Sequence, residues 1–248
     1  MRFRRALLAL AGAAVLATGM TTLLPANAQA RIMAVACDET SLITAVNAAN
    51  NAGGGTVTLT PGCTYTLTAS HGDDGVNGPT GLPIITTPIT FEGNANTITR
   101  SGATNFRIAQ VGANGSITLK AVTLSNGHAA TNGGGILNFG AVTLTGSELS
   151  GNTADGSGGA IYSTGGAAAA TFTSSNVKNN TAHQAAGIAS VNGTLTLTSS
   201  TVSGNTAGIN PGGIYYVAGT ATLNTSSVTA NAPTNCTGSP SPVPGCIG

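Results

Sequence analysis

The sequence repeats one turn-rich phrase at a nearly constant interval, and this repeat limits the possible folds more than any other feature. The phrase reads LSGNTADGSGGAIYS from Leu149 and VSGNTAGINPGGIYY from Val202, and three looser copies accompany it. The copies begin 25 to 28 residues apart, at Leu124, Leu149, Val177, Val202 and Val228. Self-similarity at such a period is the sequence signature of a solenoid, in which each repeat contacts only its neighbours.

Upstream of this column, every repeat has the alternation of a β-strand. Apolar residues lie five and seven positions upstream, with a Thr between them in each repeat. The Thr column consists of Thr118, Thr143, Thr171, Thr196 and Thr222. A further apolar column follows the Gly-rich phrase at Ile136, Ile161, Ile188 and Ile214. This alternation has the two-residue period of a β-strand, with the apolar side chains pointing inward and the Thr side chains pointing outward.

Short strands joined by Gly- and Asn-rich turns cannot bury an apolar face within one repeat, whereas stacked repeats can. We therefore predict an all-β fold, a single-stranded right-handed parallel β-helix of about seven coils spaced ~4.8 Å apart. The handedness follows from the general preference of parallel crossovers. Four Asn form a column at one bend: Asn152, Asn180, Asn205 and Asn231. Asn tolerates left-handed backbone, and stacked amides hydrogen-bond to one another, so we interpret this column as structural.

The first 30 residues are predicted to be a secretory signal peptide. They have a basic start, an apolar run from Ala6 to Leu24 and a small-residue pattern at Ala28 to Ala30. Nothing after Ala30 is apolar enough to span a membrane. We expect a mature chain that is secreted, extracellular and monomeric.

Both ends of the predicted β-helix domain, residues 31–235, carry a cap. The segment DETSLITAVNAANNAGG begins with capping residues and places Leu42, Val46 and Ala49 on one helical face. A short helix there covers the open end of the core. Residues 236–248 are rich in Pro and cannot continue a strand, so they form the second cap.

The four Cys predict two disulfides, because an exported chain folds in an oxidising compartment. Four Cys allow three pairings. The layout along the sequence favours Cys37 with Cys63 and Cys236 with Cys246. Neither pair has the spacing of a zinc site.

The charge balance excludes some partners. The chain has 8 Lys and Arg against 7 Asp and Glu, and Arg2, Arg4 and Arg5 belong to the predicted signal peptide. Nucleic acids and anionic membranes require clustered Lys and Arg, which the sequence does not have. A polysaccharide or a cell-surface protein is the expected partner.

The Gly-rich phrases resemble a known family. Gly158 to Ile161 reads Gly-Gly-Ala-Ile, Gly133 to Ile136 reads Gly-Gly-Gly-Ile, and Gly212 to Ile214 has a shorter form. These elements are similar to the repeats of polymorphic outer-membrane proteins, and the chain resembles the pectin-lyase-like right-handed parallel β-helices of exported bacterial proteins. The resemblance extends from the helical cap to Asn231. It implies the fold, but this scaffold carries lyases, hydrolases, adhesins and proteins without known activity.

An enzyme of the pectin-lyase-like kind implies converging charged groups. A lyase of this kind uses Asp residues around calcium with an Arg or Lys base, such as Arg100 or Arg107 here, and a hydrolase uses clustered carboxylates. The columns instead predict separate surface ion pairs in adjacent coils, Glu92 with Lys120 and Glu148 with Lys178. The catalytic candidates are Asp155 and His183, since each lies six residues after its column residue. No Ser or Cys nucleophile completes that pair.

One loop offers candidate calcium ligands. The segment SHGDDGVNGPTG contains His71 and the oxygen ligands Asp73, Asp74 and Asn77. Hard oxygen ligands suit calcium, but the spacing and the distal bidentate Glu of a calcium loop are missing. We interpret the segment as an excursion between coils, with these three residues as the metal candidates.

Two outward surfaces are candidates for ligand contact. Tyr162 and Tyr215 each follow a column Ile, two coils apart with Ala189 between them, and form a possible aromatic platform for a sugar ring. Three stacked Thr-x-Thr ranks form the second surface: Thr143/Thr145, Thr171/Thr173 and Thr196/Thr198. Such ranks resemble the ice-binding faces of β-helical antifreeze proteins. Lys120 and Asn224 interrupt the outer column, and Thr is a common exposed strand residue.

These observations favour an exported, non-catalytic, adhesin-like β-helix that contacts glycans or proteins. A polysaccharide lyase or glycoside hydrolase is the first alternative, because the resembled scaffold carries such enzymes. An ice-binding protein with a Thr ladder is the second alternative. No cofactor is expected, and calcium is the only metal that the loop suggests.

Overall fold

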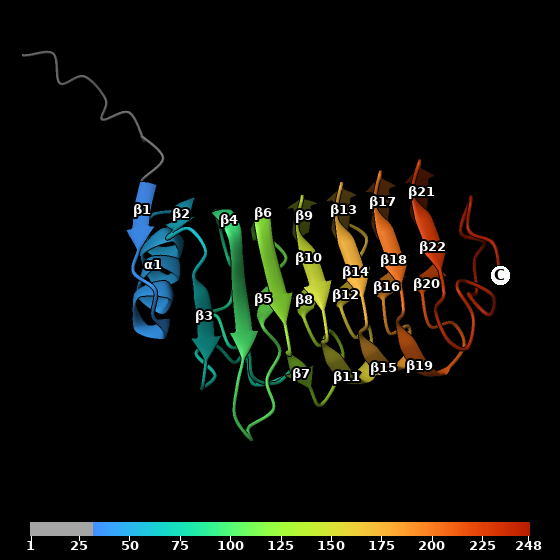
Figure 1. Cartoon of the computed structure of the whole chain (residues 1–248), viewed down its shortest axis with the longest axis horizontal. Helices are drawn as coiled ribbons and strands as arrows, with labels where there is room; N and C mark the ends of the chain where they lie inside the picture. The colour runs from blue at the N-terminus through green and yellow to red at the C-terminus, as the bar shows by residue number, and fades with distance from the viewer. Residues whose placement is uncertain (1–31) are drawn as a thin grey trace, which may run out of the picture.

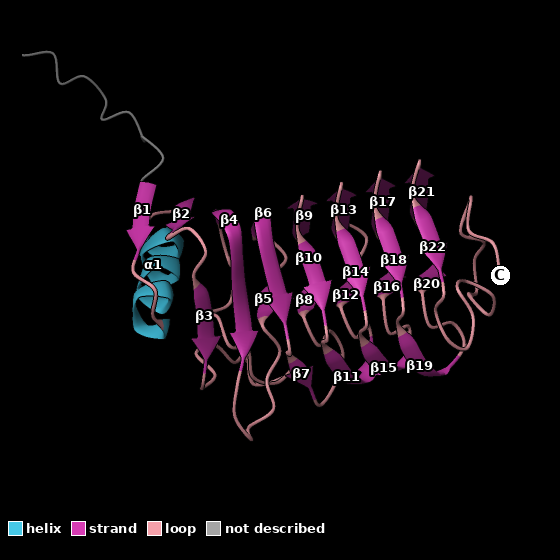
Figure 2. Ribbon diagram, viewed as in Figure 1, coloured by secondary structure: helices cyan, strands magenta, loops and turns pink. Residues whose placement is uncertain are grey.

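Parallel strands wind into a solenoid along the described chain (Figures 1 and 2). The computed structural model describes residues 32–248, and the predicted signal peptide at residues 1–30 lies outside the described residues. Strands account for 48% of the structure and one short helix for 6%, in a parallel β-solenoid of about 5 turns. The predicted all-β parallel β-helix with a short N-terminal helix is confirmed.

The strands form three sheets, of which only the large sheet extends along the whole solenoid. The large sheet has 13 strands: β1 (Ile32–Val35), β2 (Gly55–Leu59), β3 (Thr64–Leu67), β4 (Pro88–Arg100), β6 (Ser116–Ser125), β9 (Ala141–Thr145), β10 (Glu148–Ser150), β13 (Ala169–Thr173), β14 (Asn176–Lys178), β17 (Thr194–Thr198), β18 (Thr201–Ser203), β21 (Thr220–Asn224) and β22 (Ser227–Thr229). The 4-stranded sheet contains β7 (His128–Ala129), β11 (Thr153–Ser157), β15 (Thr181–Gln184) and β19 (Thr206–Ile209). The 5-stranded sheet contains β5 (Ala109–Val111), β8 (Ile136–Asn138), β12 (Ile161–Thr164), β16 (Ile188–Val191) and β20 (Ile214–Val217).

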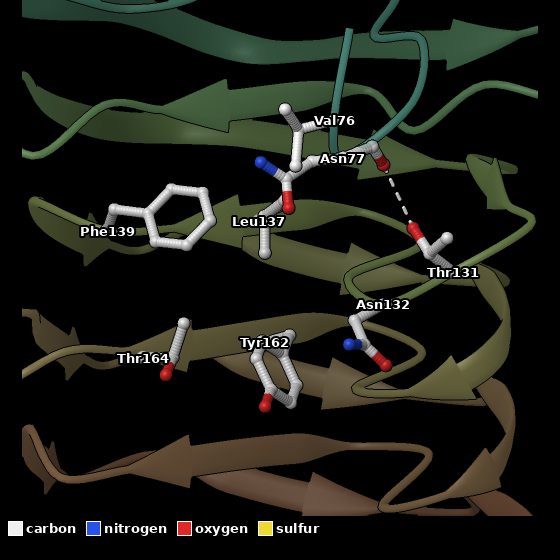
Figure 3. A pocket seen from close by; sticks show the side chains of 8 residues that line it. All are labelled: Val76, Asn77, Thr131, Asn132, Leu137, Phe139, Tyr162 and Thr164. Carbon is white, nitrogen blue, oxygen red and sulfur yellow. Dashed lines mark hydrogen bonds between the residues drawn. The ribbon is translucent and has the colours of Figure 1, made fainter. Parts of the chain in front are cut away.

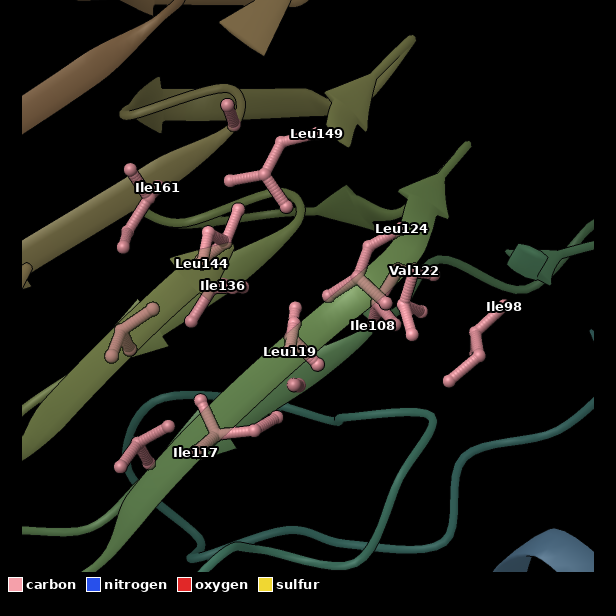
Figure 4. Packing of buried hydrophobic residues seen from close by; sticks show 14 of the residues in the cluster. Ile98, Ile108, Ile117, Leu119, Val122, Leu124, Ile136, Leu144, Leu149 and Ile161 are labelled. Atoms are coloured by element: carbon pink, nitrogen blue, oxygen red, sulfur yellow. The ribbon is translucent and has the colours of Figure 1, made fainter. Parts of the chain in front are cut away.

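The predicted apolar column defines the register of the large sheet. Leu149 pairs in parallel with Leu124 on the preceding turn and with Val177 on the next. Val202 continues the column from Val177 to Val228. All five side chains are buried, and Figure 4 shows Leu124 and Leu149 among the other apolar side chains of the interior. The predicted register is therefore confirmed, and burial of these columns is the main favourable term in folding.

The number of turns is lower than the seven coils expected. The large sheet already contains β2 and β4, but the 5-stranded sheet begins at β5 and the 4-stranded sheet only at β7. Residues 68–87, between β3 and β4, meet later turns through isolated bridges, Thr80 with Arg107 and Ile85 with Val111. The expected seven coils counted every repeat of the apolar strand pattern from Val57 onward as one coil, whereas about 5 turns are present. The difference arises because residues 68–87 do not follow the repeat.

The Asn column is a buried hydrogen-bond ladder, as expected. The side-chain amide of Asn152 donates to Asn180 Oδ1 at 3.1 Å and to the Leu124 carbonyl at 3.1 Å. Asn180 donates in the same way to Asn205 Oδ1 at 2.9 Å, and Asn205 donates to Asn231 Oδ1 at 2.8 Å. Each of these oxygens also accepts the backbone N–H of the preceding Asn. The ladder therefore satisfies buried backbone groups at the bend.

The left-handed backbone at this bend does not belong to the column Asn, so that part of the interpretation is wrong. The residues with positive φ are those just before the column, including Gly151, Asn179 and Gly204 at φ 64°, 55° and 66°. Gly and Asn adopt this conformation at the lowest cost, which explains their place in the phrase. The column Asn turn inward instead. A second buried ladder, which the sequence analysis did not predict, lies at the other bend: the N–H of Ser147 donates to the Ser175 hydroxyl, and the N–H of Ser175 donates to the Ser200 hydroxyl.

The helix α1 (Glu39–Asn51) closes the N-terminal end of the core. It begins after Asp38, whose carboxylate accepts the Ser41 N–H at 2.8 Å and thereby caps the helix. Its buried residues are Leu42, Ala45, Val46 and Ala49, which include the three predicted ones. Figure 1 shows α1 across the end of the solenoid, beside β1 and β2.

Both predicted disulfides are present. Cys37–Cys63 ties the segment before α1 to the first turn across 26 residues. Cys236–Cys246 closes a shorter loop of the C-terminal cap, with a separation of 10 residues. The cap continues the pairing of β20, since the N–H of Ile214 donates to the Asn235 carbonyl at 2.8 Å. It therefore covers part of an edge that would otherwise be exposed.

Glu39 joins α1 to the loop that follows β3, and this contact predicts a pH dependence of stability. Burial alone would raise the pKa of Glu39. Hydrogen bonds from the Thr68 hydroxyl, from His71 and from the N–H groups of Thr68 and Ala69 outweigh burial and hold the pKa at about 2, below its ordinary 4.5.

Because the pKa is lower in the folded state, this contribution is complete above pH 4.5 and is lost as the pH falls towards 2. We expect Glu39→Gln to remove about 1 kcal/mol of that acid dependence, since the carboxylate is partly exposed to solvent. Urea denaturation of both proteins across this pH range measures it. Parallel curves for the two proteins would contradict the assignment.

Candidate functional site

A groove of about 240 Å³ lies on the outward face of the 5-stranded sheet. Its floor consists of Leu137, Phe139, Tyr162 and Thr164, from β8 and β12 and the residue after β8. Its walls consist of Val76 and Asn77 from the loop between β3 and β4, with Thr131 and Asn132 from the loop after β7. Figure 3 shows these side chains gathered around one opening. None of the eight lining residues carries a charge at neutral pH.

The strand alternation places the floor of the groove. Ile136 and Ile161 point into the core, so their neighbours Leu137 and Tyr162 point outward, and the two are paired in register. Leu137 is nevertheless only 3% exposed, since the loop that carries Val76 lies next to it in the groove. Val76 itself is 84% exposed at the rim and offers an apolar contact to a bound molecule.

Arg107 holds the loop of residues 70–81 against the solenoid. Its guanidinium donates to the carbonyls of Gly78 at 2.7 Å and Asn77 at 2.6 Å, and to the Thr131 hydroxyl at 3.1 Å. The side chain is 1% exposed. Burial lowers the pKa of Arg107, and the nearby carboxylates of Asp74 and Asp73 oppose that shift. The side chain therefore spans the two loops that form the groove walls, and it positions them.

The metal candidates Asp73, Asp74 and Asn77 lie in this loop, where they hold the turn. Asp74 accepts the N–H groups of Asn77 and Val76 and the side-chain amides of Asn77 and Gln110 at 2.7–3.0 Å. The bonds from Asn77, followed by those from Gln110 and Val76, hold the pKa of Asp74 well below its ordinary value, although burial opposes them.

Asp73 accepts the Gly75 N–H at 2.8 Å, and His71 contacts Glu39 rather than these carboxylates. Within residues 32–248, no three His, Cys, Asp or Glu side chains gather as metal ligands would. Calcium binding by Asp73, Asp74 and Asn77 remains a prediction that these contacts do not favour.

The catalytic candidates Asp155 and His183 are not hydrogen-bonded to each other. Asp155 Oδ1 lies 2.9 Å from Nε2 of His128, on the preceding turn. The strand pairing explains this difference, because Thr153 pairs with His128 and the bulge between Ala154 and Ser157 shifts the register towards β15. The pair His128 and Asp155 was not identified from the sequence. His128 lies only four residues after its column residue Leu124, whereas Asp155 lies six residues after Leu149. Equal spacing from the column therefore does not predict this pair, although both residues lie at the same bend.

The two predicted ion pairs are confirmed. Lys120 Nζ lies 2.6 Å from Glu92 Oε1, and Lys178 Nζ lies 2.8 Å from Glu148 Oε2. Both pairs lie on the large sheet and are partly exposed, so each contributes little to stability. They hold four charged groups away from the groove.

The predicted Tyr and Thr columns are present in register. Tyr162 pairs with Ala189 and Ala189 pairs with Tyr215, as expected. The Thr-x-Thr ranks stack from β9 through β13 to β17. The column that contains the first Thr of each Thr-x-Thr rank is longer than the sequence analysis indicated. It consists of Thr56, Thr90, Thr118, Thr143, Thr171, Thr196 and Thr222. Ligand contact by the Tyr and ice binding by the Thr remain predictions.

The fold and the groove define a class of protein, a disulfide-capped parallel β-solenoid with an uncharged groove on one face. No family model matches the chain, and no curated protein or solved structure is significantly similar to it. The resemblance to pectin-lyase-like and polymorphic outer-membrane proteins therefore rests on the repeat motifs. Between residues 32 and 248, no helix has the length and apolar character needed to cross a membrane.

Proposed function

We propose that this protein is an exported β-solenoid that binds uncharged glycans through the groove around Tyr162. The single observation that carries the proposal is the composition of the groove, which combines two aromatic rings with two amides and no charge. Aromatic rings stack on the C–H faces of sugars, and side-chain amides and hydroxyls hydrogen-bond to sugar hydroxyls. The amides of Asn77 and Asn132 lie at the walls, beside the rings of Phe139 and Tyr162.

A binding role fits the described charges better than catalysis does. A glycosidase needs two converging carboxylates, and a lyase needs a base beside a cluster of anionic ligands. The carboxylates of Glu92 and Glu148 are engaged in ion pairs on the large sheet, and Asp74 is engaged within its own loop. The lyase or hydrolase alternative would need these groups to rearrange. Export is supported by the two disulfides, which persist in oxidising compartments.

Substitution of Tyr162 tests the proposal. The wild-type protein is expected to bind at least one neutral polymer from a panel of glucans, xylans, mannans, galactans and chitin fragments, and not pectate or alginate. Tyr162→Ala should weaken that binding by roughly tenfold, because one aromatic stacking contact is lost. Calorimetric titration measures the affinity.

Thr201→Ala is the matched control, since Thr201 is half-buried on the large sheet, away from the groove. It should bind as the wild type does. Binding confined to acidic polymers, or equal affinity of the wild type and Tyr162→Ala, would refute the proposal.

A further inference from the structure

The groove continues into a longer uncharged strip on the same face of the solenoid. One outward column of the 5-stranded sheet contains Gln110, Leu137, Tyr162, Ala189 and Tyr215. The next outward column contains Thr164, Val191 and Val217. Tyr162 and Thr164 belong both to these columns and to the groove. The strip therefore runs along the solenoid axis, from the walled end near Val76 to the open end at Tyr215.

The two Tyr of the strip lie two strands apart. Adjacent strands of a sheet are ~4.8 Å apart, so the backbones of Tyr162 and Tyr215 are separated by ~9.6 Å along the axis. Ala189 between them is fully buried, which means that the neighbouring side chains close over it. The rings and their neighbours thus form a continuous surface rather than two isolated contacts.

This spacing matches one shape of glycan. A pyranose unit of an extended β-1,4-linked chain is close in length to the strand spacing of ~4.8 Å. Successive units of such a chain are turned over, so units two apart present the same face. A chain lying along the strip would therefore bring the same sugar face onto Tyr162 and Tyr215. The strip has no cation to pair with a carboxylate or sulfate, so an uncharged chain is the complementary ligand.

We propose that the strip binds a linear, uncharged β-1,4-linked polysaccharide aligned with the solenoid axis, with Tyr162 and Tyr215 as stacking positions two units apart. This inference rests on the proposed function, and it adds the shape of the glycan and a second contact residue. Binding should then strengthen with chain length until both rings are covered. A disaccharide reaches only one ring, whereas a trisaccharide already reaches both with its first and third units.

The experiment compares oligosaccharides of increasing length by calorimetric titration. Di-, tri-, tetra- and hexasaccharides of the cello-, xylo- and manno- series are titrated against the wild type, Tyr215→Ala and Tyr215→Phe. We expect affinity for at least one series to rise by roughly tenfold from disaccharide to trisaccharide and to change little with further length. Tyr215→Ala should remove that gain without changing disaccharide binding, and Tyr215→Phe should retain it.

Two comparison ligands separate this inference from the proposed function. Malto-oligosaccharides are neutral but curved, and oligogalacturonates are extended but anionic, so both should bind more weakly. Neutral glycans that bind without dependence on length or on Tyr215, or curved chains that bind equally well, would overturn the inference and leave the proposed function standing. If none of the neutral glycans in this set or in the wider panel binds, both are wrong.

Discussion

Arg107→Met is expected to lower the free energy of unfolding by about 3 kcal/mol. The methionine fills most of the space of the arginine but donates no hydrogen bond. The Gly78 carbonyl and the Thr131 hydroxyl then lose the hydrogen bond from Arg107, and the Asn77 carbonyl keeps only the one from the Thr131 hydroxyl. Each partly buried polar group that loses its partner costs about 1 kcal/mol. Urea denaturation followed by circular dichroism measures the change.

Arg100→Met is the matched control. Arg100 also donates to backbone carbonyls, those of Asn126, Gly102 and Thr104, but it does so at the surface. Water replaces it there, so the loss should be about 1 kcal/mol. Arg107→Met should also weaken glycan binding, because the groove walls lose their support, and Arg107→Lys should restore part of it. Equal stability of the two Met variants would mean that Arg107 does not hold the loop.

Asn180→Leu is expected to be similarly destabilising, by about 3 kcal/mol. The side chain donates to the carbonyls of Leu149 and Lys178 and to Asn205 Oδ1, and it accepts two hydrogen bonds from Asn152. Leucine has a similar size but satisfies none of these partners. Because the ladder connects neighbouring turns, loss of the Asn180 hydrogen bonds weakens the contact between turns in the middle of the solenoid.

Asn176→Leu provides the comparison on the same turn. Asn176 is exposed at the start of β14, so its replacement should change the free energy of unfolding by no more than about 0.5 kcal/mol. Denaturation midpoints of the two variants in urea give the difference. A loss for Asn180→Leu no larger than that for Asn176→Leu would contradict the role of the ladder.

The periodic features could be predicted from the sequence because stacking converts sequence spacing into contact. Leu149 meets Leu124 and Val177 for this reason, and the same register places Glu148 beside Lys178. The pairing of Cys37 with Cys63 was predicted from the layout of the four Cys along the chain. These predictions required no knowledge of loops outside the repeat.

The groove was predicted only in part, because its walls do not belong to the repeat. Tyr162 was identified as a contact candidate from its column. Leu137 was not identified, because the sequence does not distinguish an apolar strand residue that lines a groove from one that packs in the core. The sequence of the loop that contains Val76 suggests calcium ligands, whereas the contact between this loop and the buried Arg107 guanidinium depends on the three-dimensional fold. Arg107 lies about 30 residues from the loop carbonyl that it binds, without a periodic relation to it.

The central claim is that an uncharged glycan binds in the groove, and amide chemical shifts locate such binding directly. The measurement is a titration of isotope-labelled protein with the neutral oligosaccharide that binds most tightly in the panel, followed by two-dimensional amide spectra. The account predicts that the largest shifts fall on the groove residues: Val76, Asn77, Thr131, Asn132, Leu137, Phe139, Tyr162 and Thr164. Shifts concentrated on the Thr column of the large sheet, or around His128 and Asp155, would contradict it.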